Sequence, residues 1–200
     1  VFMTIMLLTR IRLRSFFTLL CVGAISAPLA WNYLMKDYQR VRFLSFLNPT
    51  RDVLGTGWHA RQSIVAIGSG MFTGKGYLAG TQNQHGFMPD QHTDFPFPVW
   101  AEEHGFLGAM LLLMLYGFLV VWAVRIASVA KDRFGAVVAA GVAAIIFWQV
   151  IINLGMVMGL LPVVGVTLPL FSYGGSSVLT VMRGVGLLMN ISMRRYHFGP

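Results

Sequence analysis

One short segment of the chain concentrates its acidic residues. The segment MPDQHTDFPFPVWAEEHG, residues 88–105, holds four of the seven Asp and Glu residues: Asp90, Asp94, Glu102 and Glu103. A carboxylate can accept a proton as a general base, ligate a metal ion or cap a helix. The types and spacing of these residues make this segment the first candidate for chemistry.

The surroundings of Asp94 leave all three roles open. Prolines at positions 89, 96 and 98 prevent a continuous helix around it, and we expect the next long helix to begin near Trp100. Thr93 and Asp94 are good N-cap residue types, while the neighbouring aromatic residues would surround a base with apolar material. A metal site would draw on His92, Asp94, Glu102 and His104, whose spacing matches no tight motif.

The composition places the chain in a membrane. Of its 200 residues, 56% are hydrophobic and only 11% are charged. A helix that crosses the roughly 30 Å of a bilayer core needs about 20 apolar residues. We predict spans at about 15–35, 100–124, 136–158 and 175–193. The expected fold class is an all-α polytopic integral membrane protein, in which residues 1–200 form a single transmembrane domain.

Basic residues set the expected orientation of these spans. Lys and Arg beside short loops stay on the cytoplasmic side. Such residues cluster at 10–14, 125–133 and 194–195, so the long segment 36–99 is expected outside the cytoplasm. The net charge of +8 follows from this topology signal and from a basic outer loop, and it needs no nucleic-acid partner.

The outer loop 36–99 combines a short apolar stretch with a glycine-rich one. WHARQSIVAIGSG, residues 58–70, predicts a short helix that lies on the membrane surface or dips into the protein. Lys75 follows among glycines that allow close backbone approach to a phosphate. Ser69 and Gly76 stand where a Walker A motif needs Gly and Ser or Thr, so a tight turn beside the membrane is an equally good interpretation.

Five ordered stretches resemble the SEDS family, which contains RodA, FtsW and SpoVE. They are MKDYQRVRFLSFLNP (35–49), GWHARQSIVAIGSGMFTGKGYLAGTQ (57–82), FMPDQHTDFPFPVWAEEHG (87–105), INLGMVMGLLPVVGVTLPLFSYGGSS (152–177) and GVGLLMNISMRR (184–195). The GKG…GTQ stretch is more similar to RodA than to FtsW. The resemblance implies the C-terminal part of a roughly ten-span fold with a long structured extracytoplasmic loop. This part alone is expected to be inactive.

The resemblance also implies an activity, that of a peptidoglycan glycosyltransferase acting in cell wall elongation and cell shape maintenance. Such enzymes move a growing glycan from its undecaprenyl pyrophosphate carrier to the 4-hydroxyl of another lipid II unit. The family's essential outer-loop aspartate aligns with Asp94, the implied general base. The diphosphate would need cationic or backbone N–H partners, for which Lys75 and then Arg61 are candidates. Further substrate-binding candidates are Gln62, Ser63, His92, Thr93, Glu102, Glu103, Ser172, Tyr173 and Gly174.

A second stretch similar to the family is LPLFSYGGSS, where Pro169 breaks the backbone before the last span. Non-helical backbone at membrane depth is tolerated only where it is buried in protein or lines a cavity. We expect this turn either to line the outer end of a groove for lipid or glycan or to serve helix packing. Arg183, inside the last span, is expected to be paired or to face a cavity, with its partner in the other half of the fold.

The implied setting is the bacterial inner (cytoplasmic) membrane, with membrane lipids and a class B penicillin-binding protein, a transpeptidase, as partners. No cofactor is assigned, and a divalent metal stays open. Two other functions also stay open. A lipid II flippase or transporter would need charged residues along a path across the membrane, and a noncatalytic partner of a transpeptidase would not need the acidic cluster. The polar residues gather in the outer loop rather than in the spans, which favours the enzyme.

Overall fold

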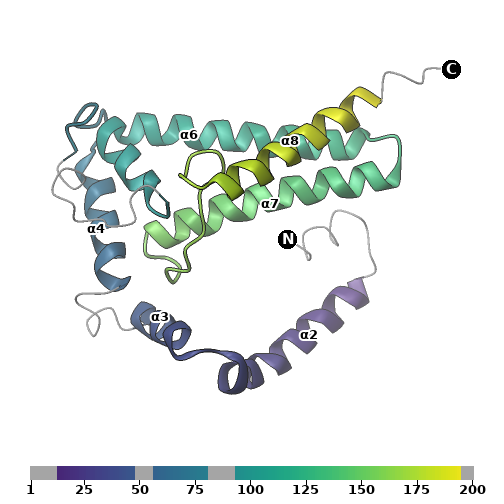
Figure 1. Ribbon diagram of the computed structural model, residues 1–200, viewed down its shortest axis with the longest axis horizontal. Helices are drawn as coiled ribbons and strands as arrows, with labels where there is room; N and C mark the ends of the chain where they lie inside the picture. Colours follow the sequence, from purple (N-terminus) through teal and green to yellow (C-terminus); the bar gives the residue numbers. More distant parts are fainter. Residues whose placement is uncertain (1–12, 48–55, 81–92, 195–200) are drawn as a thin grey trace.

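Residues 13–47, 56–80 and 93–194 are described by the computed structural model of the chain, and they form helices joined by turns (Figure 1). The helices are α2 Leu13–Leu29, the π-helical η1 Ala30–Leu34, α3 Asp37–Leu47, α4 Thr56–Ser69, α6 Pro96–Val129, α7 Arg133–Val157 and α8 Gly175–Arg194. These described residues contain no strand. The predicted all-α fold class is confirmed.

Three helices, α6, α7 and α8, lie side by side, and α4 lies across one end of them (Figure 1). The turn between α6 and α7 is fixed by Asp132, the N-cap of α7, whose carboxylate accepts a hydrogen bond from the Gly135 amide at 2.9 Å. The buried small residues of α7 include Ala139, Ala140, Ala143 and Ala144. Small side chains let helix backbones approach closely, and this explains how the bundle packs.

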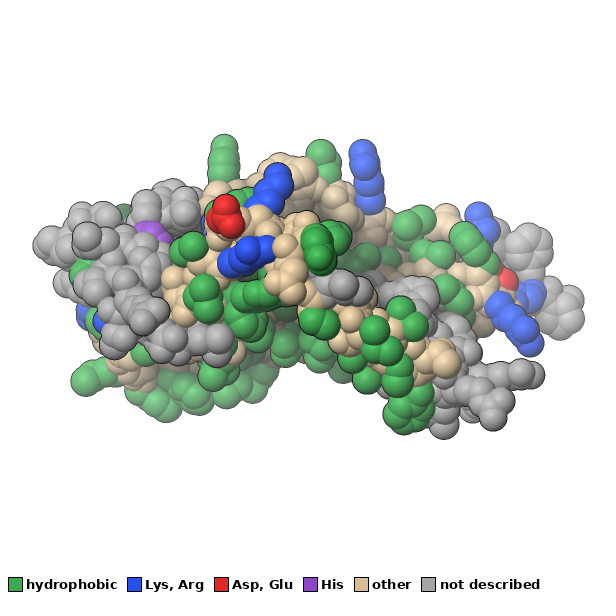
Figure 2. Space-filling model, turned by 90° about the horizontal axis from the view of Figure 1, so that it is seen from below, with side chains coloured by type: hydrophobic (Ala, Val, Ile, Leu, Met, Phe, Trp, Pro, Cys, Tyr) green, Lys and Arg blue, Asp and Glu red, His purple; other side chains and the backbone are tan. Residues whose placement is uncertain are grey.

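By length and composition, α6, α7 and α8 could each cross a membrane. The predicted spans 100–124, 136–158 and 175–193 fall on these helices. Figure 2 shows hydrophobic side chains spread over one face of the molecule, with Lys and Arg in a few separate groups; extensive exposed apolar surface is typical of membrane contact. The predicted span 15–35 falls on α2, which has 17 residues, and on η1, and its membrane crossing stays a prediction.

The start of α6 differs from the expected one near Trp100. The helix begins one turn earlier, at Pro96, with Pro98 also in its first turn. Proline is tolerated there because the N–H groups of a first turn have no partner within the helix. The prolines around Asp94 therefore mark the beginning of the helix rather than delay it.

A break at Gly105 divides α6 into two parts. The backbone of Gly105 has φ 65° and ψ −162°, which is not helical. In a continuous helix the amides at 106 and 107 would donate to the carbonyls of Glu102 and Glu103, four residues earlier. At the break these four groups need other partners, because buried backbone polar groups are almost always hydrogen-bonded.

Segment 71–76, which follows α4, supplies all four partners. The amides of Phe106 and Leu107 donate to the carbonyls of Met71 and Phe72 at 2.9 and 3.2 Å. In return, the amides of Lys75 and Gly76 donate to the carbonyls of Glu102 and Glu103, both at 3.0 Å. The segment thus replaces the missing helical hydrogen bonds and joins α4 to the first third of α6.

Two glycines make this backbone contact possible. Gly74 and Gly105 have φ values of 83° and 65°, in the left-handed region where side chains are disfavoured. A Cβ atom on Gly105 would overlap the Gly74 amide nitrogen, and one on Gly74 would overlap the Glu103 carbonyl. Both positions therefore require glycine.

Replacing Gly105 with alanine should destabilise the full-length protein by about 2 kcal/mol or more, because the added Cβ meets rigid backbone and the conformation is strained. The measurement is the midpoint of thermal unfolding in detergent. Gly117→Ala is the matched control on the same helix, since a Cβ there would meet no described atom within 4 Å. Equal unfolding midpoints for the two variants would contradict a stabilising role for the backbone contact at Gly105.

The outside location of segment 36–99 can be tested by cysteine labelling, with Cys21 removed. Tyr77 lies in this segment and Phe134 at the start of α7, and both side chains are 79% exposed. An impermeant thiol reagent added to intact cells should label Tyr77→Cys but not Phe134→Cys. Labelling of Phe134→Cys alone would reverse the orientation.

Candidate active site

Asp94 lies in the turn immediately before α6 and is partly buried. Its backbone carbonyl accepts a hydrogen bond from Asn153 Nδ2 at 3.0 Å, and the same nitrogen donates to the Val166 carbonyl at 2.6 Å. Asn153 lies near the end of α7 and is fully buried. A Cβ atom on Gly165 would lie 3.1 Å from Asp94 Oδ2. The Asp94 carboxylate therefore lies against the backbone of the turn that follows α7.

Apolar side chains next to Asp94 agree with the expected surroundings. Phe95 and Phe97 are each 2% exposed, and the His59 ring of α4 lies 6.2 Å from the Phe95 ring. The N-cap position of α6 is occupied by Phe95, which makes no side-chain cap hydrogen bond. Pro96 and Pro98 carry no N–H groups, so this end of the helix offers few donors to a capping side chain. Phe95 thus occupies the N-cap position of α6, and the role of Asp94 stays a prediction.

Glu102 has a different set of contacts, which includes the chain between Ser69 and Gly80. Its side chain is fully buried, and Oε1 lies 2.7 Å from Lys75 Nζ in an ion pair. The Ser69 hydroxyl also donates to Oε1, at 3.4 Å. A Cβ on Gly80 would lie 2.9 Å from Glu102 Oε2, so glycine leaves room for the carboxylate. The ion pair adds a side-chain link to the backbone contacts at the α6 break.

This ion pair gives Lys75 a structural partner. The position of Lys75 among glycines was interpreted as a phosphate-binding feature, and in the structure its ammonium group balances the buried Glu102 charge. Burying a carboxylate without such a partner is costly. Contact of Lys75 with a diphosphate stays a prediction.

The remaining acidic-segment candidates take other roles. Glu103 is 8% exposed, and its carbonyl pairs with the Gly76 amide. The His104 ring stacks on Trp100 with 3.7 Å between centroids. Among the described residues, no group of three His, Cys, Asp or Glu side chains is arranged to hold a metal ion. His92 lies outside the described residues, and Thr93 is partly buried beside Asp94.

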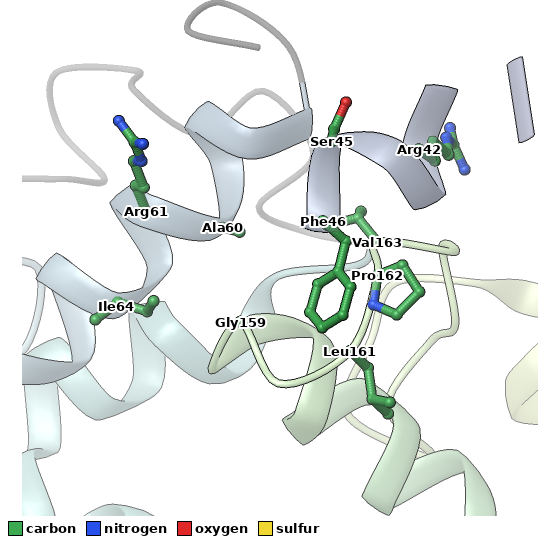
Figure 3. Close-up of a pocket in the computed structure, with 10 residues that line it drawn as sticks. All are labelled: Arg42, Ser45, Phe46, Ala60, Arg61, Ile64, Gly159, Leu161, Pro162 and Val163. Atoms are coloured by element: carbon green, nitrogen blue, oxygen red, sulfur yellow. The ribbon is translucent and has the colours of Figure 1, made fainter. Parts of the chain in front are cut away.

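One of the candidates on α4, Arg61, is among the residues around an open groove of about 290 Å³ between α3, α4 and the turn after α7 (Figure 3). Its lining residues are Arg42, Ser45, Phe46, Ala60, Arg61, Ile64, Gly159, Leu161, Pro162 and Val163. In Figure 3 the Phe46 ring projects between Gly159 and Pro162, whereas Arg61 points away from it. Gln62 is partly buried. Ser63 is fully buried, and its hydroxyl donates to the His59 carbonyl at 2.8 Å, so it is a packing residue of α4.

The turn 158–174 carries the last group of candidates. Ser172 is 4% exposed, and its Oγ accepts the Leu168 amide at 2.7 Å, which stabilises the turn. Tyr173 is 83% exposed, and Gly174 is partly buried. The Tyr116 hydroxyl of α6 donates to the Pro169 carbonyl at 2.6 Å. Arg183 is exposed on α8, and its expected pairing with a residue in the other half of the fold stays a prediction.

Two residues of this site, Asn153 and Gly165, were not among the sequence candidates. Asn153 carried a usable signal, because a polar amide inside an apolar span needs hydrogen-bond partners. Gly165 carried none, since its value lies in the space that it leaves beside Asp94.

Removing Lys75 should destabilise the full-length protein, because Glu102 would keep a buried charge without its cation. We expect Lys75→Met to cost roughly 1–3 kcal/mol, less than the cost for a fully buried pair, since the Lys75 side chain is 30% exposed. The double variant Lys75→Met/Glu102→Gln should recover part of this loss. Wild type, the two single variants and the double variant form a double-mutant cycle, and their thermal unfolding measures the coupling between Lys75 and Glu102. Strictly additive losses of stability would show that the ion pair contributes nothing.

Comparisons with known proteins agree with this architecture. Residues 1–197 match the family described as cell cycle protein and named for FtsW, RodA and SpoVE. The chain is 51% identical over 168 residues to the peptidoglycan glycosyltransferase MrdB of Escherichia coli K12, covering 84% of this chain and 45% of MrdB. It is 43% identical over 162 residues to the peptidoglycan glycosyltransferase RodA of Treponema pallidum, covering 81% of this chain and 37% of that protein. The chain thus spans less than half the length of these curated relatives.

Solved structures give the same result. A structure of a peptidoglycan synthase complex that coordinates polymerization and crosslinking is similar with a TM-score of 0.70 and 35% identity, over 93% of this chain and 51% of that chain. The crystal structure of the rod shape determining protein RodA of Thermus thermophilus is similar with a TM-score of 0.52 and 31% identity, over 84% of this chain and 58% of that chain. The three long apolar helices and these matches describe a multi-pass membrane protein, and the chain belongs to the FtsW, RodA and SpoVE family, the SEDS family that its sequence resembles.

Proposed function

We propose that the full-length protein is a peptidoglycan glycosyltransferase that joins lipid II units into glycan strands, with Asp94 as its general base. The observation that carries the proposal is the placement of Asp94, a partly buried carboxylate fixed between the start of α6 and the turn after α7. Relatives named peptidoglycan glycosyltransferases, which are 51% and 43% identical to this chain, support it.

In the proposed step, the 4-hydroxyl oxygen of the acceptor sugar forms a bond to the anomeric carbon of the donor. The bond from that carbon to the pyrophosphate oxygen breaks, and undecaprenyl pyrophosphate leaves with the electron pair. The hydroxyl proton passes to Asp94. A sugar hydroxyl is a poor nucleophile until its proton is accepted, so a positioned base accelerates this step by roughly 10² to 10⁴.

The leaving diphosphate needs positive charge or backbone N–H donors. Arg61 and Lys75 are both exposed and are the two candidate cations, and the Lys75 ammonium also contacts Glu102. A role for Lys75 would require it to serve the carboxylate and the diphosphate together. The substrate roles of Gln62, Thr93 and Tyr173 are part of the same proposal.

The proposed setting is the bacterial inner membrane, where a class B penicillin-binding protein crosslinks the strands that this protein polymerises. The similar structure of a complex that combines polymerization and crosslinking supports this partnership. The MrdB and RodA relatives, together with the rod shape determining protein, favour a role in elongation and cell shape.

Asp94→Asn should lower lipid II polymerisation by roughly 10² to 10⁴ in the purified full-length protein with its transpeptidase, while thermal stability and partner binding stay unchanged. Asp132→Asn is the matched control, because it makes the same chemical change at the N-cap of α7 and keeps capping ability. The assay is run in detergent micelles, where transport across a membrane contributes nothing to polymer formation.

Each competing role predicts a different result. A helix-capping role predicts near-normal activity for Asp94→Asn. A metal-ligand role predicts partial recovery with excess divalent ion, because affinity would be what failed. A flippase or a noncatalytic partner predicts no polymer from the wild-type protein when its transpeptidase carries no polymerase activity.

A further inference from the structure

Asp94 is held from two directions by one part of the chain, the end of α7 and the turn that follows it. Asn153 contacts the backbone of Asp94, and Gly165 lies beside its carboxylate. Val166, next to Gly165, shares the same Asn153 amide group. A single structural unit therefore contacts both the main chain and the side chain of the proposed base.

The amide group of Asn153 suits this position chemically. An amide NH₂ has two hydrogens to donate, and Asn153 Nδ2 contacts two carbonyls, those of Asp94 and Val166, at 3.0 and 2.6 Å. Both carbonyls are hydrogen-bond acceptors. A carboxylate side chain at position 153 has only lone pairs to offer, so the two carbonyls would repel it. Asn153 is 0% exposed, so its contribution is made inside the protein, away from any substrate.

Gly165 acts on the other side of the carboxylate. Its φ is +74°, and a Cβ atom would come within 3.1 Å of Asp94 Oδ2. A contact that close is tighter than ordinary van der Waals packing, so a side chain at position 165 would push the carboxylate away. The absence of a Cβ leaves room for the carboxylate against the backbone of this turn.

We infer that Asn153 and Gly165 are positioning residues that set the location of the Asp94 carboxylate for proton transfer. This inference rests on the proposed function of Asp94. A general base must lie within hydrogen-bond reach of the proton that it accepts, and a displacement of about 1 Å can cost 10² in rate. Asn153 fixes the backbone from which the side chain extends, and Gly165 fixes the space into which it extends.

The test uses the full-length protein with its transpeptidase, and lipid II polymerisation is measured per folded, partner-bound molecule. Asn153→Ala and Gly165→Ala are the test variants. Gly159→Ala is the matched control, because Gly159 lies in the same turn with a φ of +70°, and its Cβ would come within 3.1 Å of a flexible methyl group of Ile64 instead. The control therefore carries similar backbone strain without contact with Asp94.

We expect Asn153→Ala to lower kcat by about ten- to hundred-fold, with KM for lipid II unchanged because Asn153 is buried. Gly165→Ala should lower kcat to a similar extent, and Gly159→Ala should stay within about twofold of wild type. In an Asp94→Asn background, neither test substitution should reduce the residual rate further, because the group that they position is already gone. A role in stability alone would lower the yield of folded protein and leave the rate per folded molecule unchanged in both backgrounds.

The outcomes separate this inference from the proposed function. If the wild-type protein does not polymerise lipid II, the proposed function fails. If the wild type polymerises, Asp94→Asn does not, and both test variants keep wild-type kcat, the proposed function stands and the positioning role is overturned. If Asn153→Ala yields too little folded protein, the comparison of kcat between Gly165→Ala and Gly159→Ala decides the question. Equal losses of kcat in these two variants would overturn the inference.

Discussion

The structure depends on how α6 tolerates a break inside an otherwise apolar helix. Gly105 interrupts the helical hydrogen bonds, and segment 71–76 restores them through four backbone contacts. Hydrogen bonds left open near a bilayer would each cost several kcal/mol, so the break and the segment require one another. The paired glycines and the Lys75–Glu102 ion pair at the same place are consequences of this exchange. Segment 71–76 is thereby attached to α6 instead of resting on it.

This attachment and the contacts of Asp94 divide the acidic segment into two functional parts. Glu102 and Glu103 face the glycine-rich segment and serve the architecture. Asp94 faces the end of α7. Three acidic residues that look equivalent in the sequence, Asp94, Glu102 and Glu103, therefore have different neighbours, and the difference follows from the prolines that start α6 just after Asp94.

The sequence predicts the parts of this arrangement that depend on local patterns. Long apolar runs predicted α6, α7 and α8, and apolar residues that follow the polar stretch 61–63 predicted α4. The break at Gly105 was not predicted, because a single glycine in an apolar run is compatible with a continuous helix and the break depends on a segment elsewhere in the chain. The same holds for Lys75, whose partner is remote, and for Gly165, whose role is the space beside another residue. Local periodicity carries no information about such pairings.

The two sets of contacts join residues at different separations along the sequence, and this difference has a consequence for synthesis of the protein. Lys75 and Glu102 are 27 residues apart, whereas Asn153 and Asp94 are 59 residues apart. Closing a longer loop costs more conformational entropy, and Asn153 leaves the ribosome later than either partner of the ion pair. Segment 71–76 can therefore pair with α6 while α7 is still being made. The Asp94 carbonyl gains its Asn153 partner only after the end of α7 has been made.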